Sequence, residues 1–119
     1  MLSKVQLEAD SLVKMIGEFW SKDVSDIQIT DLTDFPFDMF TLHMKLYESY
    51  EIKLVYDRST LGINVKVGNQ FVGLSRLAKA PIFRGFDGYK SGNLLHNFRE
   101  LDKTLREMNM PAVAHRHDG

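Results

Sequence analysis

At 119 residues, 44% of them hydrophobic, the chain is long enough to bury one core and too short for two domains. Cysteine is absent, which excludes disulfides, thiolate catalysis and cysteine-based metal sites. The net charge of −1 conceals an asymmetry, because residues 1–51 contain ten acidic and four basic residues whereas residues 52–119 contain six acidic and eleven basic ones. Blocks of charge of one sign steer the approach of binding partners, unless the two halves of the chain interleave in space and their charges cancel.

The first predicted element is a helix that begins near Ser3 and stops around residues 21–25. Apolar residues recur there at steps of three and four, which lines one face of a helix. They are Val5, Ala9, Leu12, Val13, Ile16, Phe19 and Trp20. Ser3 followed by Gln6 fits a capping box. Glu8 and Asp10 interrupt the apolar pattern, so the segment lacks the uninterrupted hydrophobic region of a signal peptide, and we expect a cytoplasmic protein without a membrane span.

Alternating apolar and polar residues dominate the middle of the chain and predict strands. Ile27 and Ile29 indicate a short first strand, which Pro36 ends because proline cannot donate to a strand ladder. The longer predicted strands cover residues 37–47, 50–57, 61–67 and, after the hairpin signal Gly68-Asn69, 70–74. Short connections between them favour a meander.

The chain is predicted to end in a second helix. It begins near residues 91–93 and stops before Pro111, with one apolar face. That face consists of Leu94, Phe98, Leu101, Leu105 and Met108. Residues 111–119 are polar and lack periodicity, so we expect a single domain over residues 1–110 and a flexible tail.

The order of these elements indicates an α+β domain of two layers: an N-terminal helix, a four- to five-stranded antiparallel meander and a C-terminal helix. Both helices have one apolar face to bury, and the sheet has one apolar face to receive them. The other sheet face is polar and is expected to be solvated or to bind a partner. It carries Thr41, His43, Lys45, Glu51, Lys53, Asp57, Asn64 and Lys66.

No catalytic or metal-binding motif accompanies this pattern. His43, His96, His115 and His117 are the available histidines, and the pair at 115 and 117 lies in the expected tail, where nothing holds a metal geometry. Nucleophile motifs and paired carboxylates are missing as well. We therefore expect a protein that is not an enzyme and holds no metal or other cofactor.

Five aspartates fall at nearly regular intervals in the first half of the chain. They are Asp23, Asp26, Asp31, Asp34 and Asp38. They do not form a calcium loop, which needs a central glycine and a terminal bidentate glutamate. Two interpretations remain: ordinary loop and cap carboxylates, or an acidic edge that meets a basic partner.

A second candidate for partner binding is the glycine-punctuated loop at residues 83–90, which combines aromatic and basic side chains. The residues concerned are Phe83, Arg84, Phe86, Tyr89 and Lys90. Aromatics with arginine are typical of protein-binding hot spots. The alternative is that Phe83 and Phe86 close one end of the core. The near-neutral charge argues against nucleic acid as the partner.

In size, in helix–meander–helix order, in the lack of cysteine and in its acidic first half, the whole chain resembles small immunity proteins of bacterial toxin systems, such as those of contact-dependent growth inhibition. The resemblance implies a protein that binds a cognate toxin domain in the same cell and blocks its active site or another necessary surface. We expect the chain itself to be a monomer or a homodimer. Two alternatives stay open. One is a secretion-type chaperone or adaptor that dimerises through a sheet or helix, and the other is a cystatin-like domain that encloses a small ligand.

Overall fold

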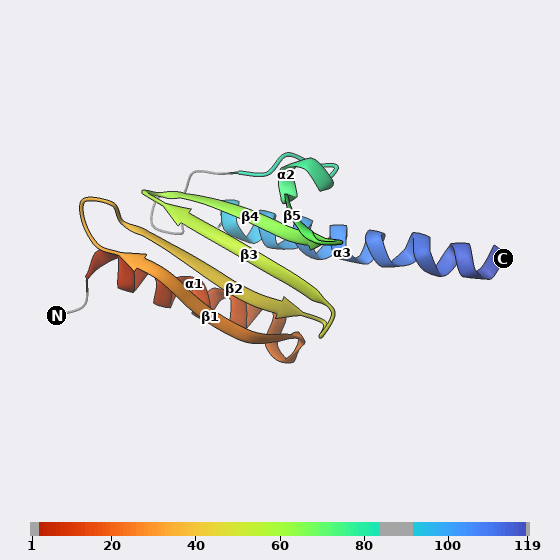
Figure 1. Cartoon of the computed structure of the whole chain (residues 1–119), viewed down its shortest axis with the longest axis horizontal. Coiled ribbons are helices and arrows are strands. Elements are labelled where there is room, and N and C mark those ends of the chain that lie inside the picture. Colours follow the sequence, from red (N-terminus) through yellow and green to blue (C-terminus); the bar gives the residue numbers. More distant parts are fainter. Residues whose placement is uncertain (1–2, 84–91, 119) are drawn as a thin grey trace.

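The computed structural model describes residues 3–83 and 92–118, with side chains as far as Met108. Within this part of the chain, an N-terminal helix precedes a five-stranded antiparallel sheet in the order β1-β2-β3-β4-β5, and a C-terminal helix follows it (Figure 1). The predicted α+β class and the meander are therefore confirmed. The elements are α1 (Lys4–Trp20), a 3-10 turn (Ser21–Asp23), β1 (Val24–Thr33), β2 (Met39–Leu46), β3 (Tyr50–Asp57), β4 (Thr60–Val67), β5 (Gln70–Gly73), α2 (Leu74–Leu77) and α3 (Gly92–Asp118).

Helix α1 begins where the sequence predicts. The side chain of Ser3 accepts a hydrogen bond of 3.1 Å from the backbone N–H of Gln6, which satisfies one of the free amides of the first turn. The side-chain amide of Gln6 donates to Asp10 at 3.0 Å. One face of α1 is buried along its whole length, through Val5, Ala9, Leu12, Ile16 and Trp20.

The sheet separates an apolar face from a polar face by strict alternation. On β2, β3 and β4 every second residue is buried, and the register places Leu42 opposite Leu54 and Leu54 opposite Ile63. The intervening side chains are partly exposed on the other face. Burial of one face fixes this register, because a slip by one residue would turn every apolar side chain to water.

Both long helices pack on the apolar face of the sheet. Figure 1 shows α1 along β1 and β2, while α3 passes behind the other half of the sheet and continues beyond it. Rings join the two helices, since the centroids of Trp20 and Phe98 lie 4.8 Å apart and those of Phe19 and Phe98 lie 5.5 Å apart. One core of buried residues therefore includes side chains from α1, the sheet, α2 and α3.

Several boundaries differ from the prediction. Strand β2 spans Met39–Leu46 in place of residues 37–47. Strand β1 has ten residues and is longer than the short strand that the sequence predicts. Bulges interrupt its alternation, so the pattern does not reveal its full length. Leu74 opens the short helix α2 and is not the last residue of a strand.

Helix α3 continues through Pro111 to Asp118, so its predicted end before the proline is wrong. A proline removes one helical hydrogen bond, and the alanines at 112 and 114 favour helix. The flexibility of residues 111–119 stays a prediction.

Candidate partner-binding edge

The five aspartates gather along one edge of the sheet, as the acidic edge that we define here by Asp23, Asp26, Asp31, Asp34 and Asp38. Strand β1 is the outermost strand on that side. Asp23 precedes it, Asp26 and Asp31 lie within it, and Asp34 and Asp38 lie in the loop to β2. Asp26, Asp31 and Asp34 are exposed, while Asp23 and Asp38 are half-buried. Three strands, β2, β3 and β4, thus lie between β1 and the opposite edge strand β5.

Backbone geometry explains why aspartate suits this edge. Asp26, Asp31 and Asp38 have positive φ angles of 55°, 56° and 47°. Aspartate adopts this left-handed conformation more readily than most residues. The first two coincide with shifts in the register between β1 and β2. Bulges and exposed charge on an outer strand hinder pairing with the edge of another sheet, so this edge is protected from aggregation.

Opposite charges do little to neutralise the acidic edge. Among the described side chains, Asp26 is the member of the acidic edge with an ion pair. Its exposed carboxylate lies 3.9 Å from Nζ of the half-buried Lys45. A contact of this kind contributes little to stability. Asp31 accepts from the hydroxyl of Thr30 at 3.3 Å. The edge therefore presents a negative potential to an approaching partner.

Apolar side chains that the sequence analysis passed over lie beside these acids. Phe35 is 85% exposed, Phe37 is 56% exposed and Met39 is 36% exposed. We refer to these three residues as the apolar tip. The sequence contained a sign of this exposed surface: two phenylalanines flank Pro36, and neither belongs to the alternating apolar series that begins at Phe40. Exposure of large apolar side chains on this scale favours a binding role.

The loop at residues 83–90 is described for Phe83 alone; Arg84, Phe86, Tyr89 and Lys90 lie outside the described residues. Phe83 is 43% exposed, so it does not plug the core. The buried side chain of Asn97 accepts a hydrogen bond from the backbone N–H of Phe83 at 3.0 Å and donates one to the carbonyl oxygen of Phe83 at 2.6 Å. The ring of His96 lies edge-on to Phe83 with centroids 5.1 Å apart. Helix α3 thus holds this segment in place.

The two described histidine side chains lie on different elements, His43 on β2 and His96 on α3. His43 lies on the polar face, paired in register with Gln28 and Lys53. The Nε2 atom of His96 lies 2.8 Å from the carbonyl oxygen of Pro81. Among the described residues, no group of three or more His, Asp or Glu side chains is placed to hold a metal ion.

A partly buried carboxylate links three elements near the β2–β3 turn. Asp102 of α3 accepts hydrogen bonds from Trp20 Nε1 at 3.1 Å, from Arg106 Nε at 2.8 Å and from the hydroxyl of Tyr47. Burial acts to raise the pKa of Asp102, but the bonds from Tyr47, Arg106 and Trp20 outweigh it and lower that pKa. Burial and the bond to Asp102 raise the pKa of Tyr47. We call these four residues the Asp102 cluster.

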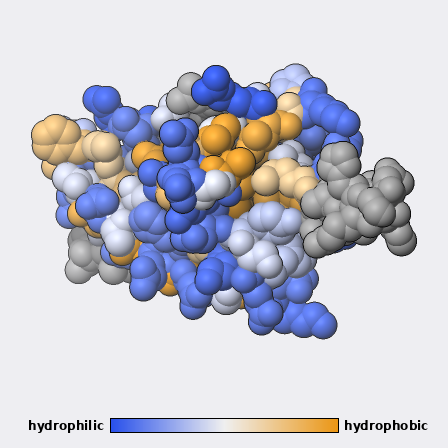
Figure 2. Space-filling model, turned by 45° about the vertical axis from the view of Figure 1, so that its right-hand side comes forward, coloured by the Kyte–Doolittle hydropathy of each residue, from blue (hydrophilic) through white to orange (hydrophobic). Residues whose placement is uncertain are grey.

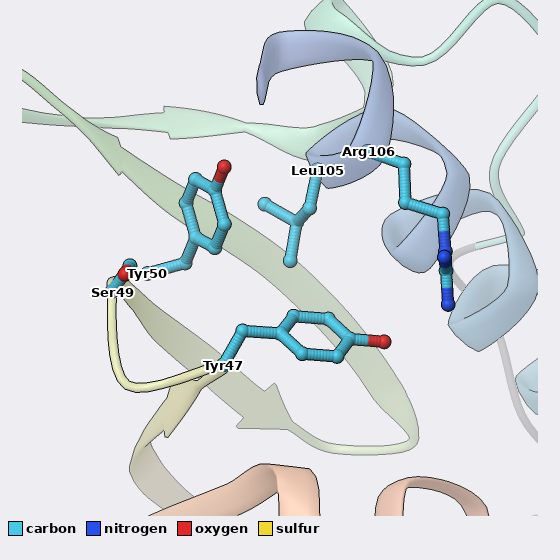
Figure 3. Close-up of a pocket in the computed structure, with 5 residues that line it drawn as sticks. All are labelled: Tyr47, Ser49, Tyr50, Leu105 and Arg106. Atoms are coloured by element: carbon cyan, nitrogen blue, oxygen red, sulfur yellow. The ribbon is translucent and has the colours of Figure 1, made fainter. Parts of the chain in front are cut away.

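A pocket of about 340 Å³ lies next to this cluster (Figure 3). Tyr47 extends from the β2–β3 turn toward Arg106, and Tyr50 and Leu105 line the same space. The guanidinium of Arg106 also lies 5.9 Å from the ring centre of Tyr47. Since the carboxylate of Asp102 already accepts three hydrogen bonds, the arrangement favours a structural role over proton transfer.

The polar face of the sheet is balanced in charge. Lys66 pairs with Glu51 at 3.3 Å, and Lys53 lies over the ring of Phe71 at 4.6 Å from its centre. Hydrophilic residues dominate the view in Figure 2, and hydrophobic residues reach the surface in its upper middle part and at its left-hand end. This face has no excess of one sign that compares with the acidic edge.

Comparison with protein-family models, curated proteins and solved structures gives no match. None of the described helices is both long and apolar enough to span a membrane.

Proposed function

We propose that this chain is a non-catalytic protein-binding domain whose acidic edge binds a basic partner protein. The observation that carries the proposal is the gathering of five aspartates along one outer strand, where a single long ion pair to Lys45 is described. Negative charge on a rim of this kind accelerates association with a positively charged surface and selects against acidic partners. The remaining acids of residues 1–51 lie on α1, in the β2–β3 turn and, for Glu51, at the start of β3.

The partner that we propose is a toxin domain of the same cell, which the chain neutralises by covering a functional surface. Support comes from the resemblance to small immunity proteins in size, in order of elements and in the acidic first half. A toxin that acts on nucleic acid or another anionic substrate needs a basic surface, and an acidic edge complements such a surface.

A secretion-type chaperone or adaptor is the second candidate. The polar face of the sheet favours it, because such proteins dimerise through a sheet or helix and this face is partly exposed. A cystatin-like ligand domain is less favoured, since side chains of α1 and α3 fill the space against the apolar face of the sheet.

Affinity purification from the native cell tests the proposal. Wild type is compared with the variant Asp26→Asn/Asp31→Asn/Asp34→Asn, in which asparagine keeps the local backbone geometry and removes three charges. We expect a stoichiometric basic protein with wild type and much less of it with the variant. Co-expression of the partner with and without the chain then shows whether its toxicity is suppressed. Recovery of an acidic partner, or of equal amounts with both baits, would contradict the proposal.

A further inference from the structure

The apolar tip combines features that rarely persist on a free surface. Phe35 and Phe37 expose most of their rings to water, and Met39 adds a third apolar side chain at the end of β2. Aromatic rings have the largest apolar area of any side chains, so their transfer from water into a pocket contributes strongly to binding. Anchors of an interface are typically such residues, surrounded by a polar rim.

Hydrogen bonds hold the tip in shape before any partner arrives. The backbone N–H groups of Phe37 and Asp38 donate to the carbonyl oxygen of Asp34 at 3.1 and 3.4 Å. The backbone N–H of Arg58, in the β3–β4 turn, donates to the carbonyl oxygen of Asp38 at 3.0 Å. The loop is therefore closed on itself and tied to a neighbouring turn. Pre-ordering of this kind lowers the entropic cost of binding.

Charge around the tip decides which partner it fits. Asp31, Asp34 and Asp38 are close to it in the chain, and the side chain of Arg58 pairs with Asp57 at 3.0 Å. Three carboxylates repel an anionic membrane surface, so insertion into lipid is disfavoured. A second copy placed tip to tip would bring like charges together. A protein surface with lysine or arginine around an apolar pocket suits both the rings and the acids.

We propose that the apolar tip is the anchor of the partner interface, and that Phe35 and Phe37 enter an apolar pocket of a partner protein whose rim carries lysine and arginine. This inference rests on the proposed function, because it specifies how the acidic edge engages its partner. It moves the anchor from the loop at residues 83–90, where the sequence analysis placed it, to the β1–β2 loop.

Site-specific photo-crosslinking in the native cell tests the anchor. Benzoylphenylalanine replaces one residue at a time: Phe35 at the tip, Asp26 on the acidic edge, or Phe71 on the opposite edge strand as the matched control. We expect a protein adduct from position 35, none from position 71, and a crosslinked site in the partner that lies among apolar residues within a segment rich in lysine and arginine. Adducts with lipid, or with a second copy of the chain, would overturn the inference.

Position 26 separates the two proposals. An adduct from position 26 without one from position 35 would leave the proposed function standing and refute the anchor. Absence of a protein adduct from both positions would refute both.

Titration of the crosslinked partner gives the energetic test. We expect Phe35→Ala/Phe37→Ala to weaken its affinity by at least about tenfold, whereas Phe71→Ala, which removes a ring that is 38% exposed, changes it less than about twofold. Denaturant midpoints of both variants should stay close to wild type, because the deleted rings are exposed. A loss below about threefold in the folded double variant would overturn the anchor.

Discussion

Trp20 and Asp102 lie 82 positions apart in the chain, and the indole N–H of Trp20 donates to the carboxylate of Asp102 at 3.1 Å. The same carboxylate accepts from Tyr47 in the β2–β3 turn and from Arg106 one helical turn further along α3. One acidic side chain therefore connects the end of α1, a turn of the sheet and the C-terminal helix. Partly buried hydrogen bonds to a charged acceptor are stronger than neutral ones.

Asp102→Ala is predicted to lower the free energy of unfolding by about 3 kcal/mol, because it leaves the N–H of Trp20 and the hydroxyl of Tyr47 without their acceptor. Urea unfolding measures the loss. Glu107→Gln serves as the control. Glu107 also lies on α3, but its ion pair is with the exposed Lys79 outside that helix, so its loss should cost less than about 0.5 kcal/mol. Equal losses in the two variants would show that the Asp102 cluster has no special weight.

Acid should remove the contribution of Asp102 selectively. The hydrogen bonds to this carboxylate overcome the opposing effect of burial and hold its folded-state pKa below the ordinary value. Its contribution is therefore complete above the unfolded pKa, which is about 4, and is lost as pH falls through the lower folded-state pKa. We expect the difference in unfolding free energy between wild type and Asp102→Asn to be constant near neutral pH and to shrink below that value. A difference that grows on acidification would contradict this assignment.

The acidic edge should act mainly on the rate of association. Asp31→Asn/Asp34→Asn removes two exposed charges, and asparagine tolerates the positive φ of 56° at position 31. We expect the association rate constant with the basic partner to fall by roughly threefold to tenfold at low salt, and by less at high salt. Stopped-flow mixing measures it. Glu18→Gln, which removes an exposed charge on α1, is the control and should leave the rate nearly unchanged.

Asn97 and Phe83 are in contact, but their substitutions are expected to cost different amounts of stability. Asn97 is fully buried and binds both backbone groups of Phe83, so Asn97→Ala should cost about 2 kcal/mol of unfolding free energy. Phe83→Ala removes a ring that is 43% exposed and should cost less than about 1 kcal/mol. Thermal or denaturant melts compare the two. A loss near 3 kcal/mol for Phe83→Ala would restore the core-plug interpretation of that residue.

The β3–β4 hairpin offers a stabilising change. Arg58 and Ser59 both adopt positive φ, 45° and 74°, in a two-residue turn between the paired residues Asp57 and Thr60. Glycine relieves this strain, so Ser59→Gly should raise the free energy of unfolding by about 0.5–1 kcal/mol. Gly68→Ala, at a φ of 65° in the β4–β5 turn, should lower it by a similar amount. The same sign for both variants would contradict the argument.

Local patterns were sufficient to predict most of the architecture. Alternation over β2, β3 and β4 identifies both faces of those strands, because side chains point to opposite sides of a strand at every step. The sequence also predicted helix α1, from the cap at Ser3 to the buried Trp20. Such signals depend on neighbours within four residues, so the sequence alone contains them.

Tertiary structure decided what depends on distant partners. The full length of β1 escaped prediction because bulges at Asp26 and Asp31 break its alternation, and only pairing with β2 identifies it as a strand. The exposure of Phe35 is equally invisible locally, since an apolar residue looks the same whether the fold covers it or not. Trp20, Tyr47 and Asp102 meet only in the folded chain, because contact between residues this far apart in sequence requires the packed core that brings α1, the sheet and α3 together.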